Sequence, residues 1–450
     1  MRTPQEITLD TSCGRIRGLE TERCLQFLGV PYAHAGRFAY AEPVGHWDGE
    51  LDATANGFCC PQNRAVHEHL EHPTRRFYKN EFREGIDFRY DEDCLNLNIY
   101  TPVQAQNCPV IIYIHGGGFD SGMNCEGPFD GSAFAERGII TVFLNYRVGV
   151  LGYLTHREIR ERTGRDGNFG LDDQLTAIRW VREHIADFGG DAGNITLMGQ
   201  SAGAISIQYL CLNRSNAGLF ERAVMLSGGG LFPGFALPRR AEETHAYWEQ
   251  FMRLAGCSTL DELRTVPTEK LFDAVESIRA VRKDNLYNTM PVVDGLLLPR
   301  PVQELAADPL SVDYMLSCTS ADMFAPVLAH MAARYAKQTN AYLCFFDLDA
   351  PGDRNGAFHS ADLRYAFETL DGSWRPYGDR DREASRQLAG YIAGFARTGD
   401  PNGKGLPLWE PARKHALRPA LCISAGGTRM GRMNYPKLLF NYLTKGDPKA

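Results

Sequence analysis

Residues 194–206 read NITLMGQSAGAIS and hold one serine, Ser201, between Gly199 and Gly203. A strand-like apolar run precedes the first glycine, and a helical pattern follows the second. A serine in a G-x-S-x-G pattern at a strand-to-helix bend can act as a nucleophile, because the bend exposes its hydroxyl. The helix that begins there also directs unpaired N–H groups and the positive end of its dipole toward developing negative charge. An ordinary tight turn gives the same pattern, so the rest of the chain has to distinguish the two.

A nucleophilic serine needs a base, and the base needs a carboxylate that orients it. His359 lies in an irregular Gly- and Asp-rich loop directly after the strand pattern 341–348, where a catalytic base is expected. Asp322 follows an earlier strand pattern, 314–319, and is the candidate acid, although it also suits the cap of a helix. Three other histidines follow Ser201, two in helical patterns and one in an exposed loop: His245, His330 and His415.

Acyl transfer also needs hydrogen-bond donors for the oxyanion. The stretch YIHGGGFDSG, residues 113–122, ends a predicted strand with three consecutive glycines. Glycines let the backbone approach a substrate and turn its N–H groups inward. A flexible turn is the alternative, but an HGGG loop commonly works with the N–H that follows the serine, here that of Ala202.

The predicted elements bring these residues to one edge of a sheet. Apolar runs of strand length alternate with helical patterns, and one helix, within 171–188, shows an apolar stripe: Leu171, Leu175, Ile178, Val181 and Ile185. This alternation predicts an α/β protein with a mainly parallel central sheet flanked by helices. We find no repeat or linker, so we expect a single domain over residues 1–450.

Composition excludes several other classes of protein. A net charge of −7 disfavours a nucleic-acid partner. No run of 18 apolar residues occurs, so no membrane-spanning helix is expected, and the polar N-terminal residues lack the apolar segment of a secretory signal. The twelve cysteines are scattered, which favours reduced thiols in a cytoplasmic protein. The oligomeric state cannot be read from the sequence.

A histidine-rich stretch, HEHLEH, is the one candidate metal site. It contains His67, His69 and His72 but has neither zinc-site spacing nor a paired cysteine. We interpret these histidines as a solvated face, and we expect no metal and no organic cofactor.

Several longer motifs resemble the type-B carboxylesterase family, which includes para-nitrobenzyl esterases and cholinesterases. The resemblance runs almost from end to end and is carried in order by FLGVPYA (27–33), CPQ (60–62), EDCLNLNIYTP (92–102), HGGGF (115–119), NYRVGVLGYL (145–154), GNFGLDDQ (167–174), FGGDAGNITLMGQSAGA (188–204) and GDPNGKGLPLWEP (399–411). It implies an α/β-hydrolase fold and serine esterase chemistry without a cofactor.

The resemblance also implies roles for single residues. Ser201 is then the nucleophile, His359 the base and Asp322 the third triad member. Many relatives have a glutamate at the position of Asp322, which stands here in the segment ADM. The implied oxyanion donors are the N–H groups of Gly117, Gly118 and Ala202. Ser227 resembles a serine that supports the acid, whereas Arg147 with Asp173 and Arg37 with Glu92 resemble structural salt bridges.

Departures from the family pattern bear on the substrate. Secreted relatives close a loop with cysteines at the positions of Cys60 and Cys94; the same pair here permits that disulfide, and the sequence does not decide whether it forms. No tryptophan occurs between Trp47 and Trp180, which disfavours a choline ester as the preferred substrate. The short span from Asp322 to His359 predicts a reduced helical cap and a more open site that accepts bulky esters.

We therefore predict a serine carboxylesterase that acts through an acyl-enzyme on small or bulky uncharged esters. Two alternatives remain: a catalytically silent binding module of the same fold, and an acyltransferase that uses the same triad. The latter shares the acyl-enzyme with hydrolysis, so the sequence does not separate the two.

Overall fold

The computed structural model describes residues 3–62, 73–229, 237–281, 289–322, 331, 335, 339–412 and 420–432. The histidine-rich stretch 67–72, as well as His330 and His415, lies outside this described part. So does most of the helix expected after Asp322, and the reduced cap therefore stays a prediction.

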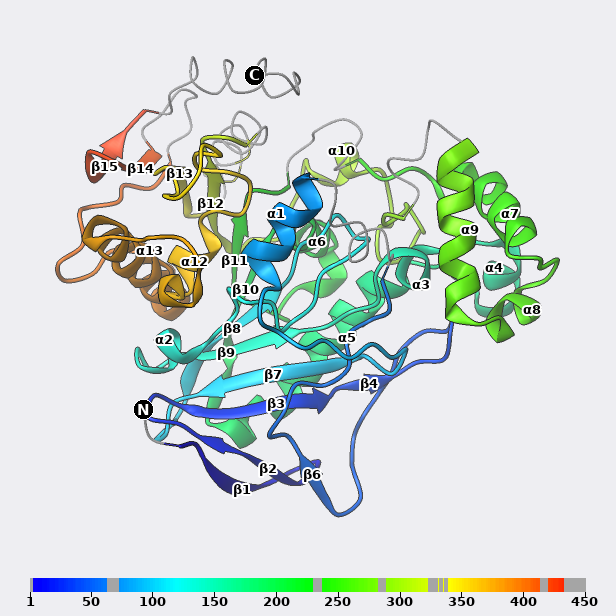
Figure 1. Cartoon of the computed structure of the whole chain (residues 1–450), viewed down its shortest axis with the longest axis horizontal. Coiled ribbons are helices and arrows are strands. Elements are labelled where there is room, and N and C mark those ends of the chain that lie inside the picture. The colour runs from blue at the N-terminus through cyan, green and yellow to red at the C-terminus, as the bar shows by residue number, and fades with distance from the viewer. Residues whose placement is uncertain are drawn as a thin grey trace.

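A thirteen-stranded sheet forms the centre of the molecule (Figure 1). Its main path runs β1 (Gln5–Thr11), β2 (Gly14–Glu20), β3 (Leu25–Pro31), β7 (Asn96–Thr101), β9 (Ile140–Leu144), β8 (Cys108–Ile114), β10 (Gly190–Gln200), β11 (Arg222–Leu226), β12 (Asp313–Thr319), β13 (Ala341–Asp347), β14 (Ala420–Ser424) and β15 (Gly427–Gly431), with β6 (Glu50–Asp52) beside β2. A short pair, β4 (Ala33–His34) and β5 (Glu42–Pro43), stands apart.

The strands from β9 through β14 pair in parallel, as the apolar runs predict. Both ends of the sheet are antiparallel, through β1–β2–β3–β7–β9 at one end and β14–β15 at the other. The mixed sheet confirms the predicted α/β class, and its parallel centre collects the carboxyl ends of β8, β10, β11, β12 and β13 at one edge.

Helices cover both faces of this sheet. They are α1 (Pro73–Phe82), α2 (Ser132–Ala135), α3 (Gly149–Tyr153), α4 (Arg157–Thr163), α5 (Phe169–His184), α6 (Ala202–Leu212), α7 (His245–Leu254), α8 (Leu260–Thr265), α9 (Thr268–Val281), α10 (Val302–Leu305), α12 (Leu363–Ala366) and α13 (Asp379–Thr398). Figure 1 shows α4, α7, α8 and α9 gathered at one end of the molecule.

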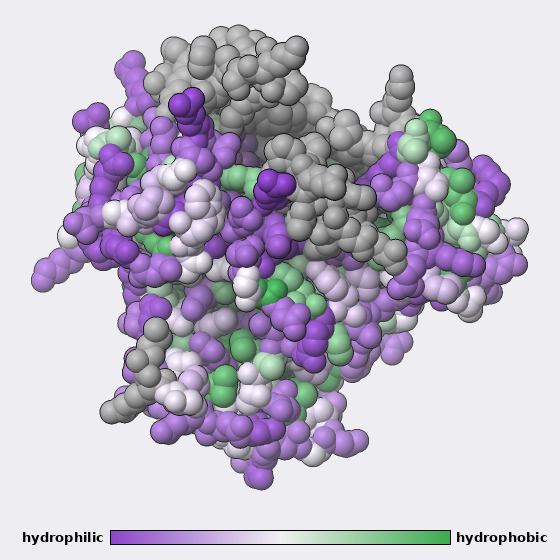
Figure 2. Space-filling model, in the orientation of Figure 1, coloured by the Kyte–Doolittle hydropathy of each residue, from purple (hydrophilic) through white to green (hydrophobic). Residues whose placement is uncertain are grey.

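The two faces of β10 contribute to two different hydrophobic clusters. Leu197 packs into a cluster with residues of α5 and α6, whereas Met198 packs into one with residues of α13. This alternation is the period of two that places successive strand residues on opposite faces. The five apolar residues of the predicted stripe are all buried in the first cluster. On the face of the molecule in Figure 2, hydrophilic side chains cover most of the coloured surface and hydrophobic ones form small groups.

Candidate active site

Ser201 occupies the bend between β10 and α6. Its backbone has φ 54° and ψ −122°, a conformation that L-residues rarely adopt. The amide of Ser201 donates to the carbonyl of Leu226 on β11, and its carbonyl accepts from Ile205 in the first turn of α6. The bend is therefore anchored on both sides, and Ser201 is 7% exposed.

The two glycines of the motif are required by close packing at this bend. A Cβ on Gly203 would lie 2.0 Å from the carbonyl oxygen of Ile114 on β8. A Cβ on Gly199 would lie 2.8 Å from the carbonyl carbon of Gly203. The strand-to-helix turn is thus tight enough that only glycine fits at either position, which explains the G-x-S-x-G spacing.

His359 and Asp322 come together from the ends of two neighbouring parallel strands. Asp322 follows β12, His359 lies in the loop after β13, and 2.9 Å separates His359 Nδ1 from Asp322 Oδ2. The carboxylate side chain is 2% exposed and the imidazole 30%. When Nδ1–H donates to the buried carboxylate, Nε2 is left as the basic nitrogen of the ring.

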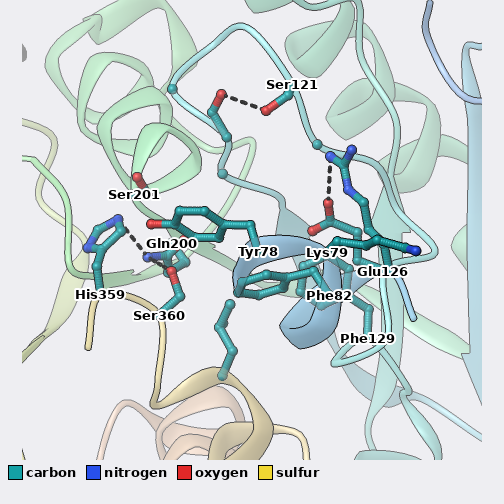
Figure 3. Close-up of a pocket in the computed structure, with 16 residues that line it drawn as sticks. Tyr78, Lys79, Phe82, Ser121, Glu126, Phe129, Gln200, Ser201, His359 and Ser360 are labelled. Atoms are coloured by element: carbon teal, nitrogen blue, oxygen red, sulfur yellow. Dashed lines mark hydrogen bonds and ion pairs between the residues drawn. The ribbon is translucent and has the colours of Figure 1, made fainter. Parts of the chain in front are cut away.

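Ser201 and His359 line the same cavity, which has a volume of about 330 Å³ (Figure 3). The glycine loop that follows β8 also lines it, and the backbone has φ 109° at Gly117 and φ 65° at Gly118. Ala202 is the first residue of α6, so its N–H has no acceptor within the helix. The structure thus brings the predicted nucleophile, base and glycine loop around one space.

Gln62 holds the far end of this glycine loop. Its Nε2 donates to the carbonyl of Gly122 at 2.6 Å, and its Oε1 accepts from the Gly122 amide at 3.1 Å. The imidazole of His115 stacks on Tyr146, with ring centroids 4.3 Å apart. Burial lowers the pKa of His115 to about 4, so this ring is neutral at pH 7 and is a structural part of the loop.

Two residues beside the base were not singled out from the sequence. The Gln200 amide donates from Nε2 to Ser360 Oγ at 2.8 Å, and the same Nε2 lies 3.1 Å from His359 Nε2. Ser360 has φ 78°, another conformation that favours glycine. The only sequence signal for them is adjacency, since Gln200 precedes Ser201 and Ser360 follows His359.

The wall formed by α1 was also missed from the sequence. Tyr78, Lys79 and Phe82 of α1 line the cavity together with Arg83, which directly follows the helix, and Figure 3 shows the Tyr78 ring extending toward Ser201 and His359. Nothing in the pattern of this short helix indicated where it docks.

One ion pair belongs to this wall. Arg83 lies 3.3 Å from Glu126 Oε1 across the cavity edge, and both side chains are 11% exposed. Burial raises the pKa of Glu126 above its usual value, and the nearby positive charge of Arg83 offsets only part of that rise.

Ser227 lies at the end of β11, where its amide donates to the carbonyl of Ser317 on β12. Its side chain is fully buried, and within the described part of the chain its hydroxyl has no hydrogen-bond partner. Its role in supporting the acid therefore stays a prediction.

Both predicted structural salt bridges form. Arg147 NH2 lies 2.7 Å from Asp173 Oδ1 with both side chains almost fully buried, and Arg37 pairs with Glu92.

The cysteines at the family's bridge positions are present as thiols. All twelve cysteines are free in the structure. A hydrogen bond with Cys60 and burial raise the pKa of the Cys94 thiol. Among the described residues, no three His, Cys, Asp or Glu side chains form a group that could hold a metal ion. No described helix is both long enough and apolar enough to cross a membrane.

Comparison with known proteins gives a consistent result. A model described as "Carboxylesterase family" matches residues 5–325 and 321–437. Para-nitrobenzyl esterase of Bacillus subtilis (strain 168) is 29% identical over 485 aligned residues, which cover 92% of this chain and 94% of that protein. Carboxylesterase 5A of Canis lupus familiaris is also 29% identical, over 89% of this chain and 82% of that protein. A solved structure titled PNB esterase superposes with a TM-score of 0.82 at 26% identity and covers 96% of this chain and 99% of its own.

Proposed function

The chain belongs to the carboxylesterase family and is a serine hydrolase of carboxylic esters, and we propose that Ser201, His359 and Asp322 carry out this reaction. The observation that carries the assignment is the 2.9 Å pair of His359 Nδ1 and Asp322 Oδ2, because His359 lines the same cavity as Ser201. The strained bend at Ser201 supports it, because such strain gathers at functional sites.

In the proposed mechanism, Ser201 Oγ attacks the ester carbonyl and His359 Nε2 takes the hydroxyl proton. Asp322 holds the ring in the required tautomer and stabilises the imidazolium that forms. His359 then protonates the leaving alcohol, and water repeats the sequence on the acyl-enzyme.

We assign the oxyanion to the N–H groups of Gly117, Gly118 and Ala202. A donor of this kind contributes about 2.7–4 kcal/mol to the transition state where one has been removed. Two glycines with positive φ and the free first turn of α6 support the assignment, because all three N–H groups belong to the segments that line the cavity.

The direct test is hydrolysis of para-nitrophenyl acetate, butyrate and octanoate by the wild type and by Ser201→Ala. We expect the variant to lose at least about 10³-fold in kcat, because the residual rate comes only from the oxyanion site and binding. Ser206→Ala is the matched control, since Ser206 is a buried serine of α6, the helix that follows Ser201, and lies outside the cavity lining. Equal measurable rates for wild type and Ser201→Ala would refute the role of Ser201, and no hydrolysis by either protein would favour a silent binding module.

Transfer of the acyl group to an alcohol is a separate outcome of the same acyl-enzyme. Adding an acceptor alcohol and measuring how the product divides between acid and new ester distinguishes hydrolysis from transfer.

The proposal includes a single catalytic domain in the cytoplasm that acts on small or bulky uncharged esters and has no nucleic-acid partner. One sheet that takes in strands from residue 5 to residue 431 supports the single domain. The scattered cysteines support a reducing compartment. Counting reactive thiols in the denatured protein, without a reductant, tests the redox state.

A further inference from the structure

The helix α1 presents two different side-chain faces. Tyr78 and Phe82 line the cavity, and we call these two rings the aromatic wall (Figure 3). Phe77 and Glu81, each one residue earlier, share a second face, because residues four apart lie on one side of a helix. Phe77 packs edge to face on Phe358, with ring centroids 4.9 Å apart, and Glu81 is buried. The contacts of this second face therefore decide where the aromatic wall stands.

Glu81 occupies a position that the helix itself does not favour. It lies in the last turn of α1, where the negative end of the helix dipole opposes a carboxylate. Its side chain is only 3% exposed, and a buried charge without a partner is costly. The carboxylate of Glu81 therefore depends on a group outside the helix.

Arg375, which lies between α12 and α13, is that group. Its Nε donates to Glu81 Oε1 at 3.0 Å, its Nη2 lies 2.9 Å from the same oxygen, and Trp374 Nε1 donates to it at 2.9 Å. The same guanidinium binds the loop after β13, since Nη2 donates to Asp353 Oδ2 and Nη1 to the carbonyl of Pro351, both at 2.7 Å. The fully buried side chain of Arg375 thus joins α1 to the loop that carries the base.

The contacts of Arg375 define a geometry more than they add stability. Replacing a buried ion pair by apolar side chains of similar volume is often neutral or stabilising. The planar fork of an arginine instead fixes the direction of every acceptor that it binds. The guanidinium also lies 5.0 Å from the centre of the Phe358 ring, directly before His359 in the chain. Arg375 therefore fixes α1 relative to the side of the cavity on which the base lies.

Loss of Arg375 should displace the wall more than the base. The base has an anchor of its own, because Asp322 Oδ2 lies 2.9 Å from His359 Nδ1. The end of α1 also stays attached, since the carbonyl of Phe82 accepts from the Gly127 amide at 2.7 Å. The face that carries Glu81 would lose its partner while the triad keeps its internal contact.

We propose that Arg375 is a positioning residue for the substrate. Through Glu81 it holds the aromatic wall in the place where the two rings enclose an ester in front of Ser201. Arg375 lies outside the cavity lining, so it acts on binding through α1 and not on the reacting atoms. This inference rests on the proposed role of Ser201 as the nucleophile.

The test is the steady-state hydrolysis of para-nitrophenyl butyrate by the wild type and Arg375→Met, at a temperature at which circular dichroism shows both proteins folded. Methionine is a long side chain that makes none of the polar contacts of Arg375. We expect KM to rise about 5- to 10-fold with kcat within about twofold of the wild-type value, because binding common to substrate and transition state is lost. A lower kcat at an unchanged KM, or wild-type values of both, would overturn the proposal.

Arg147→Met is the matched control. Arg147 is another buried guanidinium, 4% exposed in its pair with Asp173, and it lies outside the cavity lining. Its loss should lower the melting temperature and leave KM at the wild-type value. A similar rise in KM in this variant would assign the effect to a general loosening of the fold and would overturn the proposal.

A double-mutant cycle tests whether Arg375 acts through α1. Tyr78→Ala combined with Phe82→Ala removes the aromatic wall and leaves Arg375 nothing to position. In that background Arg375→Met should change KM by less than about twofold, because the two sets of changes act on the same binding contacts. The same rise in KM with and without the aromatic wall would contradict the proposal.

A second variant covers the case in which Arg375→Met yields no folded enzyme. Arg375→Lys keeps the positive charge and loses the planar fork. A rise in KM of about threefold would support the proposal, and an unchanged KM would overturn it. Ser201→Ala tests the nucleophile separately, since hydrolysis that survives in that variant contradicts the proposed function whatever the KM of the Arg375 variants.

Discussion

Three serines at the carboxyl edge of the sheet hold backbone conformations that usually require glycine. Ser201, Ser227 and Ser360 have φ of 54°, 49° and 78° and follow β10, β11 and His359 respectively. Each such residue costs of order 1–3 kcal/mol and persists only where its surroundings fix it. Ser201 and Ser360 both line the cavity, and the backbone strain at these two positions therefore supports the site.

Ser360 offers a way to separate that strain from its hydrogen bond. Glycine relieves the strained backbone whereas alanine keeps it, and both remove the hydroxyl that accepts from Gln200. We expect Ser360→Gly to be more stable than Ser360→Ala by about 1 kcal/mol in chemical denaturation. Both variants should lower kcat about fivefold, because the Gln200 amide beside His359 Nε2 loses its anchor.

The two substitutions control for each other. Equal stability would show that the backbone at Ser360 is relaxed in solution. Full activity in both variants would show that the Gln200 contact does not help to hold the base.

The chemistry of these residues was readable from the sequence only where a local pattern encodes it. Ser201 stands in a motif whose glycines are dictated by contacts as close as 2.0 Å, and His359 and Asp322 follow strand patterns. Gln200 and Ser360 carry no such pattern. Their roles depend on contacts between segments far apart in the chain, such as Gln200 with Ser360, and on burial that only the fold creates.

Among the helices, α1 contributes most to the shape of the cavity. Tyr78 and Phe82, one turn apart, stack with ring centroids 5.9 Å apart and both line the site. Phe77, on the same helix, packs instead against Phe358 with centroids 4.9 Å apart and is outside the lining. One short helix thus has one aromatic face toward the cavity and another toward the protein.

We predict that Phe82→Ala moves the acyl preference toward longer chains. Removing a ring from a cavity of about 330 Å³ makes room for several methylenes, each of which contributes to binding when it is enclosed. The ratio of kcat/KM for para-nitrophenyl octanoate to that for the acetate should rise about tenfold. Phe77→Ala is the control, and an unchanged ratio in Phe82→Ala would show that the acyl chain lies elsewhere.

The elements themselves were predicted unevenly. The parallel centre and the α5 stripe follow from local apolar periodicity, so the sequence indicates them directly. The antiparallel ends depend on which strands become neighbours. The docking of α1 over the cavity depends on tertiary contacts, such as Arg83 with Glu126, that join segments far apart in the chain.

The fold as a whole packs one hydrophobic cluster on each face of the central sheet. A buried ion pair, Arg147 with Asp173, connects several segments on one side of this sheet. Arg147 follows β9, pairs with Asp173 of α5 and donates to the carbonyl of Ala39 at 2.7 Å. The guanidinium is also 5.2 Å from the centre of the Phe169 ring. One side chain therefore joins a strand end, a helix and the N-terminal segment.

Removing one partner of this buried pair should lower the free energy of unfolding far more than the same kind of change in an exposed pair. Asp173→Asn leaves a guanidinium that is 4% exposed without its counter-charge, and a broken buried pair of this kind costs about 3–5 kcal/mol. Glu136→Gln is the matched change at an exposed pair with Arg23, where both side chains are more than 40% exposed and the loss should be at most about 1 kcal/mol. Urea denaturation at pH 7 measures both losses of stability, and added salt should reduce only the loss in Glu136→Gln.

Because neither Asp173 nor Glu136 lines the cavity, kcat per folded molecule should stay at the wild-type value in each variant. A small loss in Asp173→Asn would mean that water or the neighbouring carbonyls already satisfy Arg147, and that packing alone holds α5 to the sheet.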